Sequence, residues 1–213
     1  MASTIGTVRK GKTETQKRPY ELGKRLEQMD HRRAAVLRAA RSQLESRGYR
    51  ELTMASLAAE SGITRQTIHN LFGTRAAVLE ALFDALALDG GMEKMREVMT
   101  QPTAEAMLER FVEVFCGFWA GHRVLFRRVH GIGAIDPVLG AVLKARNRRR
   151  LMAATRIVSL SGVRESVDQT AAALAALTSF EFYDALAEDS VDDSQAAAAV
   201  LDLAQQLLAR ARS

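Results

Sequence analysis

The sequence predicts an all-α protein, and three observations carry that prediction. Alanine and leucine are abundant and only 3 prolines occur in 213 residues, a composition that favours helices. Apolar residues recur three and four positions apart along most of the chain, which is the helical period. No stretch alternates apolar and polar residues as a half-buried strand does. The hydrophobic content of 47% is typical of a globular protein with a real core.

The first elements can be placed from their caps. Residues 1–29 are polar and basic, and we expect a partly disordered arm, to which residues 20–29 could add a short helix. A helix is expected from Asp30 until Gly48. Thr53 is the expected N-cap of a short helix that Gly62 closes. A second short helix then ends at residue 73.

Longer helices are expected in the rest of the chain. Thr74 caps a helix that ends near residues 90–91, and Asp136 followed by Pro137 is a strong start signal for another, which stops near residue 160. The remaining helices are expected at 92–99, 103–121, 123–130, 165–188 and 194–212.

Charge is unevenly distributed along the chain. Residues 1–75 carry 15 Lys/Arg and 7 Asp/Glu, a net charge of +8, whereas residues 76–213 carry 15 and 18, a net charge of −3. This asymmetry predicts a polyanion-binding module attached to a second unit. A basic tail that only improves solubility is the alternative.

Several protein classes fit the sequence poorly. The single cysteine, Cys116, rules out an intrachain disulfide and fits a reducing, cytoplasmic compartment. We find no signal peptide and no apolar run long enough for a membrane span. No two of the 4 histidines have the i, i+4 spacing of a helical metal site, and no catalytic or phosphate-binding motif occurs. We therefore expect neither an enzyme nor a metal or cofactor.

The two short helices between residues 53 and 72 fit a helix-turn-helix. Ala58 is small enough for a helix crossing, Gly62 tolerates the left-handed turn, and Ile68 supplies a branched apolar anchor. With Ile68, Leu71 and Phe72 facing inward, the second helix must present its polar side chains to the outside. A generic solvated helix hairpin is the alternative to a DNA-binding unit.

The outward side chains are those that a recognition helix needs. Arginine pairs with guanine, glutamine and asparagine pair with adenine, and threonine can contact the thymine methyl. The first turn should enter the major groove, later residues should touch phosphates, and the helix N-termini favour phosphate too. The predicted DNA-binding residues are Thr53, Thr64, Arg65, Gln66, Thr67, His69, Asn70 and Arg75.

The stretch "LTMASLAAESGITRQTIHNLFGTRAAVLEALF" resembles the DNA-binding segment of the tetracycline-repressor (TetR/AcrR) family of bacterial transcriptional regulators. The resemblance covers roughly residues 30–85. Three positions depart from the family pattern. His69 stands where a phosphate-contacting tyrosine is usual, Arg75 where lysine is usual, and Gln66 where a small residue is common. We interpret Gln66 as a base-reading candidate.

The resemblance implies a three-helix helix-turn-helix domain at 30–76 and a larger helical ligand-binding and dimerisation domain at 77–213. The last two predicted helices carry many small residues, which favours close packing with a second copy, although intramolecular core is the alternative. An aromatic stripe could be core or could line a cavity for a small apolar or aromatic effector. The candidate cavity residues are Phe118, Trp119, Phe126, His130, Thr155, Phe180 and Tyr183.

The basic run "KARNRRR" at residues 144–150 is most simply a solvated helix face. It could instead meet DNA, an acidic ligand or a neighbouring helix.

These features together predict a cytoplasmic, homodimeric repressor that binds a palindromic double-stranded DNA operator and is released by its effector. An architectural protein that binds DNA without sequence preference and without an effector is the rival hypothesis.

Overall fold

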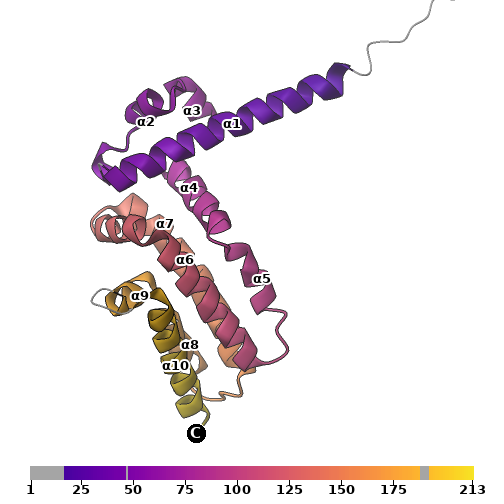
Figure 1. Ribbon diagram of the computed structural model, residues 1–213, viewed down its shortest axis with the longest axis vertical. Coiled ribbons are helices and arrows are strands. Elements are labelled where there is room, and N and C mark those ends of the chain that lie inside the picture. The colour runs from indigo at the N-terminus through magenta and orange to yellow at the C-terminus, as the bar shows by residue number, and fades with distance from the viewer. Residues whose placement is uncertain (1–16, 47, 188–191) are drawn as a thin grey trace, which may run out of the picture.

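The computed structural model describes residues 17–46, 48–187 and 192–213, and within these ranges the chain is helical without strands. This confirms the all-α prediction. The helices form an upper head and a lower body, with α4 running from one to the other (Figure 1). The helix bounds are α1 Lys17–Ser46, α2 Met54–Ser61, α3 Arg65–Phe72, α4 Arg75–Asp89, α5 Met95–Val98, α6 Ala104–Gly133, α7 Pro137–Leu160, α8 Val167–Leu177, α9 Phe180–Leu186 and α10 Asp193–Arg212. Short 3-10 turns occupy Tyr49–Glu51 and Met92–Lys94.

The caps that the sequence predicted are present at their expected positions. The hydroxyl of Thr53 accepts a hydrogen bond from the Ser56 amide, and the hydroxyl of Thr74 accepts one from Ala77. Asp136 caps α7 with Pro137 in its first turn. Gly62 has φ 71°, the left-handed conformation that an L side chain rarely adopts. Each cap satisfies backbone groups that a helix end leaves without partners.

Helix α1 differs from the sequence prediction. It begins at Lys17, so no separate short helix precedes residue 30, and the helix extends well beyond the rest of the head (Figure 1). Its residues from 24 to 32 are exposed. Low hydrophobicity in this stretch therefore signals a solvated helix rather than a break, because lysine, arginine, glutamate and leucine are strong helix formers. The part of the predicted arm before residue 17 lies outside the described residues.

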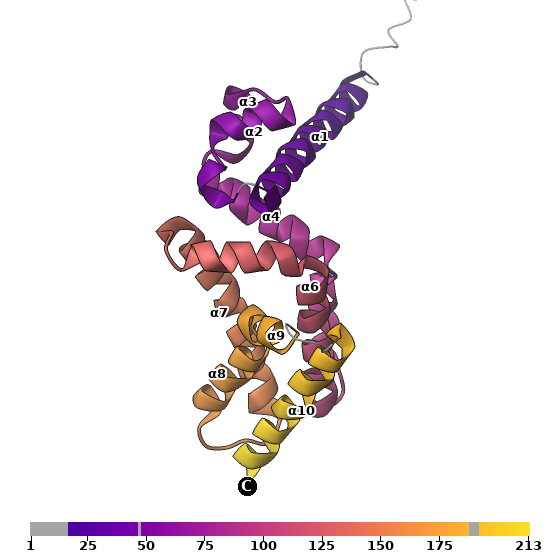
Figure 2. The same cartoon turned by 60° about the vertical axis from the view of Figure 1, so that its left-hand side comes forward.

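Helix α6 joins two segments that the sequence separated. It is continuous through residue 122, but His122 has non-helical dihedrals (φ −131°, ψ 19°) and kinks it. The His122 Nδ1 lies 3.0 Å from the Phe118 carbonyl oxygen. Beyond the kink, α6 crosses the top of the body beneath the head (Figure 2).

The long helix expected at 165–188 is broken into α8 and α9. Ser179 caps α9 by accepting a hydrogen bond from the Phe182 amide at 3.2 Å. The carbonyl of Thr178, just before the break, accepts a hydrogen bond from the indole of Trp119 at 3.1 Å. A tertiary contact thus occupies a backbone acceptor where the helix is interrupted, which helical periodicity alone does not reveal.

The core passes from head to body along α4. Val78 and Leu79 are fully buried near its start, and Phe83 and Leu86 are buried further along. Cys116 is also buried in the body, where burial raises the pKa of its thiol to about 12. Cys116 is therefore a small hydrophobic core residue. Among the described helices, none is long and apolar enough to cross a membrane.

Candidate DNA-binding face and effector cavity

The helix-turn-helix presents the predicted polar face to solvent. Ile68 is fully buried, whereas Arg65, Gln66, His69 and Asn70 are exposed on α3. The Gln66 side-chain amide donates a hydrogen bond to the Asn70 Oδ1 at 3.0 Å. Asn70 therefore orients Gln66 one turn earlier on the same face. The structure brings these side chains together, as the helical period predicted.

The two N-cap threonines have local roles that leave them at the surface. Thr53 and Thr64 are exposed, and the hydroxyl of Thr64 accepts a hydrogen bond from the Thr67 amide at 3.2 Å. The hydroxyls of Thr64 and Thr67 lie 2.9 Å apart. Met54, which sequence reasoning did not select, borders a shallow surface hollow with Arg65, Gln66 and His69.

Arg75 is placed differently from the prediction of a simple phosphate contact. Its guanidinium donates a hydrogen bond to the Leu52 carbonyl at 3.4 Å and lies 3.7 Å from the carboxylate of Asp136. The side chain thus connects the head to the start of α7, because residues far apart in sequence meet at this point. The spacing of residues along the sequence could not reveal the contacts of Arg75 with Leu52 and Asp136. A phosphate contact by Arg75 remains a prediction.

Two side chains of α1 hold the helix-turn-helix in position. Arg33 donates a hydrogen bond to the Leu71 carbonyl at 2.9 Å and lies 4.5 Å from the centre of the Phe72 ring. The fully buried Gln43 donates to Glu60 and accepts a hydrogen bond from Ser56 at 2.8 Å. A buried polar group with its partners satisfied restricts the packing of α1 on α2 and α3.

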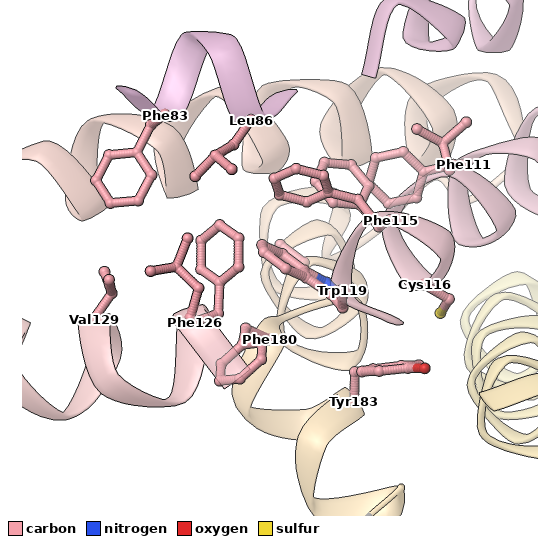
Figure 3. Close-up of a cluster of buried hydrophobic side chains, with 14 of the residues drawn as sticks. Phe83, Leu86, Phe111, Phe115, Cys116, Trp119, Phe126, Val129, Phe180 and Tyr183 are labelled. Carbon is pink, nitrogen blue, oxygen red and sulfur yellow. The ribbon is translucent and has the colours of Figure 1, made fainter. Parts of the chain in front are cut away.

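The body encloses a cavity of about 370 Å³ between α4, α5, α6 and α7. Aromatic side chains dominate its wall, and Figure 3 shows Phe83, Phe115, Trp119 and Phe126 gathered around one region. Trp119 and Phe126 are in edge contact, with ring centres 4.9 Å apart. The full lining is Phe83, Asp84, Ala87, Met92, Met95, Phe115, Phe118, Trp119, Phe126, His130, Leu143, Arg146, Asn147, Arg149 and Arg150. A cavity of this size and apolar character fits a small organic molecule.

Four of the seven predicted cavity residues line this space: Phe118, Trp119, Phe126 and His130. Phe180 does not line it but lies behind the wall, with its ring centre 5.7 Å from both Trp119 and Phe126. It supports the rings that face the cavity.

Thr155 and Tyr183, which the sequence placed in the cavity wall, do not line this cavity. The Thr155 hydroxyl donates to the Leu151 carbonyl within α7, and the helical period places Ala154, not Thr155, on the face of Arg150. The Tyr183 hydroxyl donates to Asp193 of α10, and its ring lies apart from the group around Trp119 (Figure 3).

The contributions of α4 and α7 to the cavity were missed. α4 is hydrophobic on more than one side, which predicts burial against two neighbours but not which side meets a ligand. On α7 the side chains of the basic run 144–150 differ in burial according to the face of the helix on which they lie. Lys144, Arg148 and Arg149 are exposed, whereas Arg146 pairs with Asp84 at 2.7 Å and Arg150 is buried. Among the described residues, no group of three histidine, cysteine or acidic side chains could hold a metal ion.

Comparisons with known proteins agree with this geometry. Residues 36–82 match the model of the bacterial regulatory proteins of the tetR family. The chain is 33% identical over 95 residues to the HTH-type transcriptional regulator EthR of Mycolicibacterium smegmatis, a match that covers 44% of this chain and 43% of that protein. The chain therefore spans less than half the length of that curated relative.

Solved structures share the fold over most of the chain. A TetR-family regulator from Syntrophomonas wolfei superposes with a TM-score of 0.68 at 18% identity, covering 84% of this chain and 96% of that one. A transcriptional regulator from Saccharomonospora viridis in complex with choline has a TM-score of 0.61 at 19% identity, covering 81% and 95%.

Proposed function

We propose that this chain is a transcriptional regulator of the tetracycline-repressor family, as the match of residues 36–82 supports, and that it is a repressor released from DNA by a small molecule. Two copies bind a palindromic operator in the cytoplasm, one α3 in each half-site. The observation that carries the proposal is that α4 serves both parts of the molecule. It begins directly after α3 and also supplies Phe83, Asp84 and Ala87 to the cavity wall.

Base contacts are assigned to the exposed start of α3. Arg65 and Gln66 read base edges, Thr64 and Thr67 lie at the entering turn, and His69 contacts phosphate from the later turn. Thr53 adds a phosphate contact at the start of α2. Asn70 orients Gln66 and also faces the sugar-phosphate backbone of the DNA.

Release follows from contacts between α4 and the cavity. Gly90, just past the end of α4, packs so closely on α6 that an added Cβ would lie 2.4 Å from Phe118 and 2.9 Å from His122. A ligand that displaces Phe118 therefore acts on the end of α4 and, through that helix, on the spacing of the two heads. It shifts the equilibrium only by its differential affinity for the two arrangements.

Competition binding tests the DNA-binding part of this proposal. An operator is first selected from genomic fragments. We expect the chain to bind this operator at least about 10³-fold more tightly than it binds random DNA at the same salt concentration. An effector that fills the cavity should then lower operator affinity, and operator should lower effector affinity by the same factor. Equal affinity for operator and random DNA would favour an architectural role instead.

We assign dimerisation to the surface formed by α8 and α10. The two helices border an apolar groove in which small side chains allow close helix approach. Its lining is Ala173, Ala176, Leu177, Phe182, Leu203, Gln206, Leu207 and Arg210.

Leu203→Asp should convert the dimer to a monomer, because it places a charge in the lining of this apolar groove. The measurement is the mass in solution by sedimentation. Leu160→Asp is the matched control, since Leu160 is also exposed but lies at the end of α7, outside the groove. A Leu203→Asp variant that remains dimeric would place the interface elsewhere.

A further inference from the structure

Arg150 is a buried cation that lacks an adequate partner. The residue is only 7% exposed, and its Nε is buried without a hydrogen-bond partner among the described residues. Its guanidinium carbon lies 5.8 Å from the centre of the Phe115 ring on the cavity wall. Burial lowers the pKa of Arg150 to about 10, although attraction to Glu181 opposes that effect. Burial of a charge without a hydrogen-bonded partner is costly, so the site favours an anion.

The carboxylates near Arg150 are engaged elsewhere. Glu181 accepts a hydrogen bond from His130, with 2.6 Å between the Oε1 and Nδ1 atoms. Asp84 is the acidic side chain in the cavity wall, and it accepts a hydrogen bond from Arg146 at 2.7 Å. No ion pair within the described part of the chain involves the guanidinium of Arg150. The wall therefore has one buried positive charge whose Nε donor is unused.

We propose that the effector is an apolar monocarboxylate, an aryl- or alkyl-carboxylic acid whose carboxylate is held by Arg150. The planar guanidinium matches a carboxylate through two parallel hydrogen bonds. Because the wall has one buried cation, a ligand with a single negative charge would balance it. The apolar body of the ligand lies against Phe115, Trp119 and Phe126, which are buried and line the same cavity as the cation. This inference rests on the proposed function in taking the cavity as the effector site.

Matched pairs of acids and alcohols test the inference without DNA. The probes are phenylbutanoate with phenylbutanol and octanoate with octanol, measured by Trp119 fluorescence and by the shift in melting temperature. We expect at least one acid to bind the wild-type chain about tenfold or more tightly than its alcohol, the gain typical of hydrogen bonds to a charged group. Equal binding of acid and alcohol, or no binding of any probe, would overturn the inference.

Substitutions in α7 test whether the preference for the acid over the alcohol depends on Arg150. Arg150→Met, which keeps an unbranched apolar stem, should lose the preference for the acid but retain alcohol binding, and Arg150→Lys should give an intermediate preference. Arg148→Met is the control, because Arg148 is exposed on the same helix and does not line the cavity. Without ligand, Arg150→Met should melt no lower than wild type. A markedly lower melting temperature, or a retained preference for the acid, would overturn the inference.

Operator release is measured separately with the same probes. If an acid binds through Arg150 while the operator remains bound, the inference stands and the release mechanism fails. If the neutral alcohols alone release the operator, the release mechanism stands and the inference fails.

Discussion

Trp119→Ala should lower the free energy of unfolding by about 3–5 kcal/mol, the cost typical of removing a buried aromatic side chain. Trp119 is 5% exposed and contacts the rings of Phe115, Phe118, Phe126 and Phe180. Its indole also donates the hydrogen bond to the Thr178 carbonyl between α8 and α9. The substitution therefore removes both packing and a tertiary hydrogen bond. Urea unfolding measures the loss.

Trp119→Phe separates these two contributions. It keeps a ring at the site and leaves the Thr178 carbonyl without its donor, which should cost about 1–3 kcal/mol. The Phe variant should remain folded, bind effector more weakly as judged by the shift in melting temperature, and recognise operator without effector, because α3 lies in the head. A Trp119→Ala variant no less stable than Trp119→Phe would show that the ring contributes little to the body.

Arg65→Ala and Gln66→Ala should each weaken operator binding by about 1–3 kcal/mol and relax sequence preference at one position of the half-site. Both side chains are exposed at the leading turn of α3. Affinity should be measured on operator, on singly substituted operators and on random DNA at one salt concentration. Equal losses on operator and random DNA would mean that the two residues touch only phosphate.

Two further variants sharpen that experiment. Arg96→Ala removes an exposed arginine from α5, in the body, and controls for the loss of one positive charge. Asn70→Ala removes the hydrogen bond that orients Gln66 and should reproduce part of the Gln66→Ala effect. If Asn70→Ala and Gln66→Ala were fully additive, the two side chains would act independently.

Local signals were sufficient for the helix-turn-helix. Thr53, Gly62, Thr74 and Asp136 were identified as caps or turn residues from the sequence, and each has that role in the structure. The outward face of α3 followed from its period around the buried Ile68. These features depend on hydrogen bonds and spacing within about four residues, so neighbouring residues contain the necessary information.

The cavity required the tertiary structure. An aromatic stripe on α6 indicated Trp119 and Phe126, but nothing near Thr155 or Tyr183 in sequence shows that their hydroxyls are engaged by Leu151 and Asp193. The basic run 144–150 likewise has the composition of a solvated face. Only the packing of α7 against α4 and α6 decides that Arg146 pairs with Asp84 while Arg150 is buried beside Phe115. Helical period orders the side chains around each axis, whereas the orientation of one helix against another depends on contacts between distant residues.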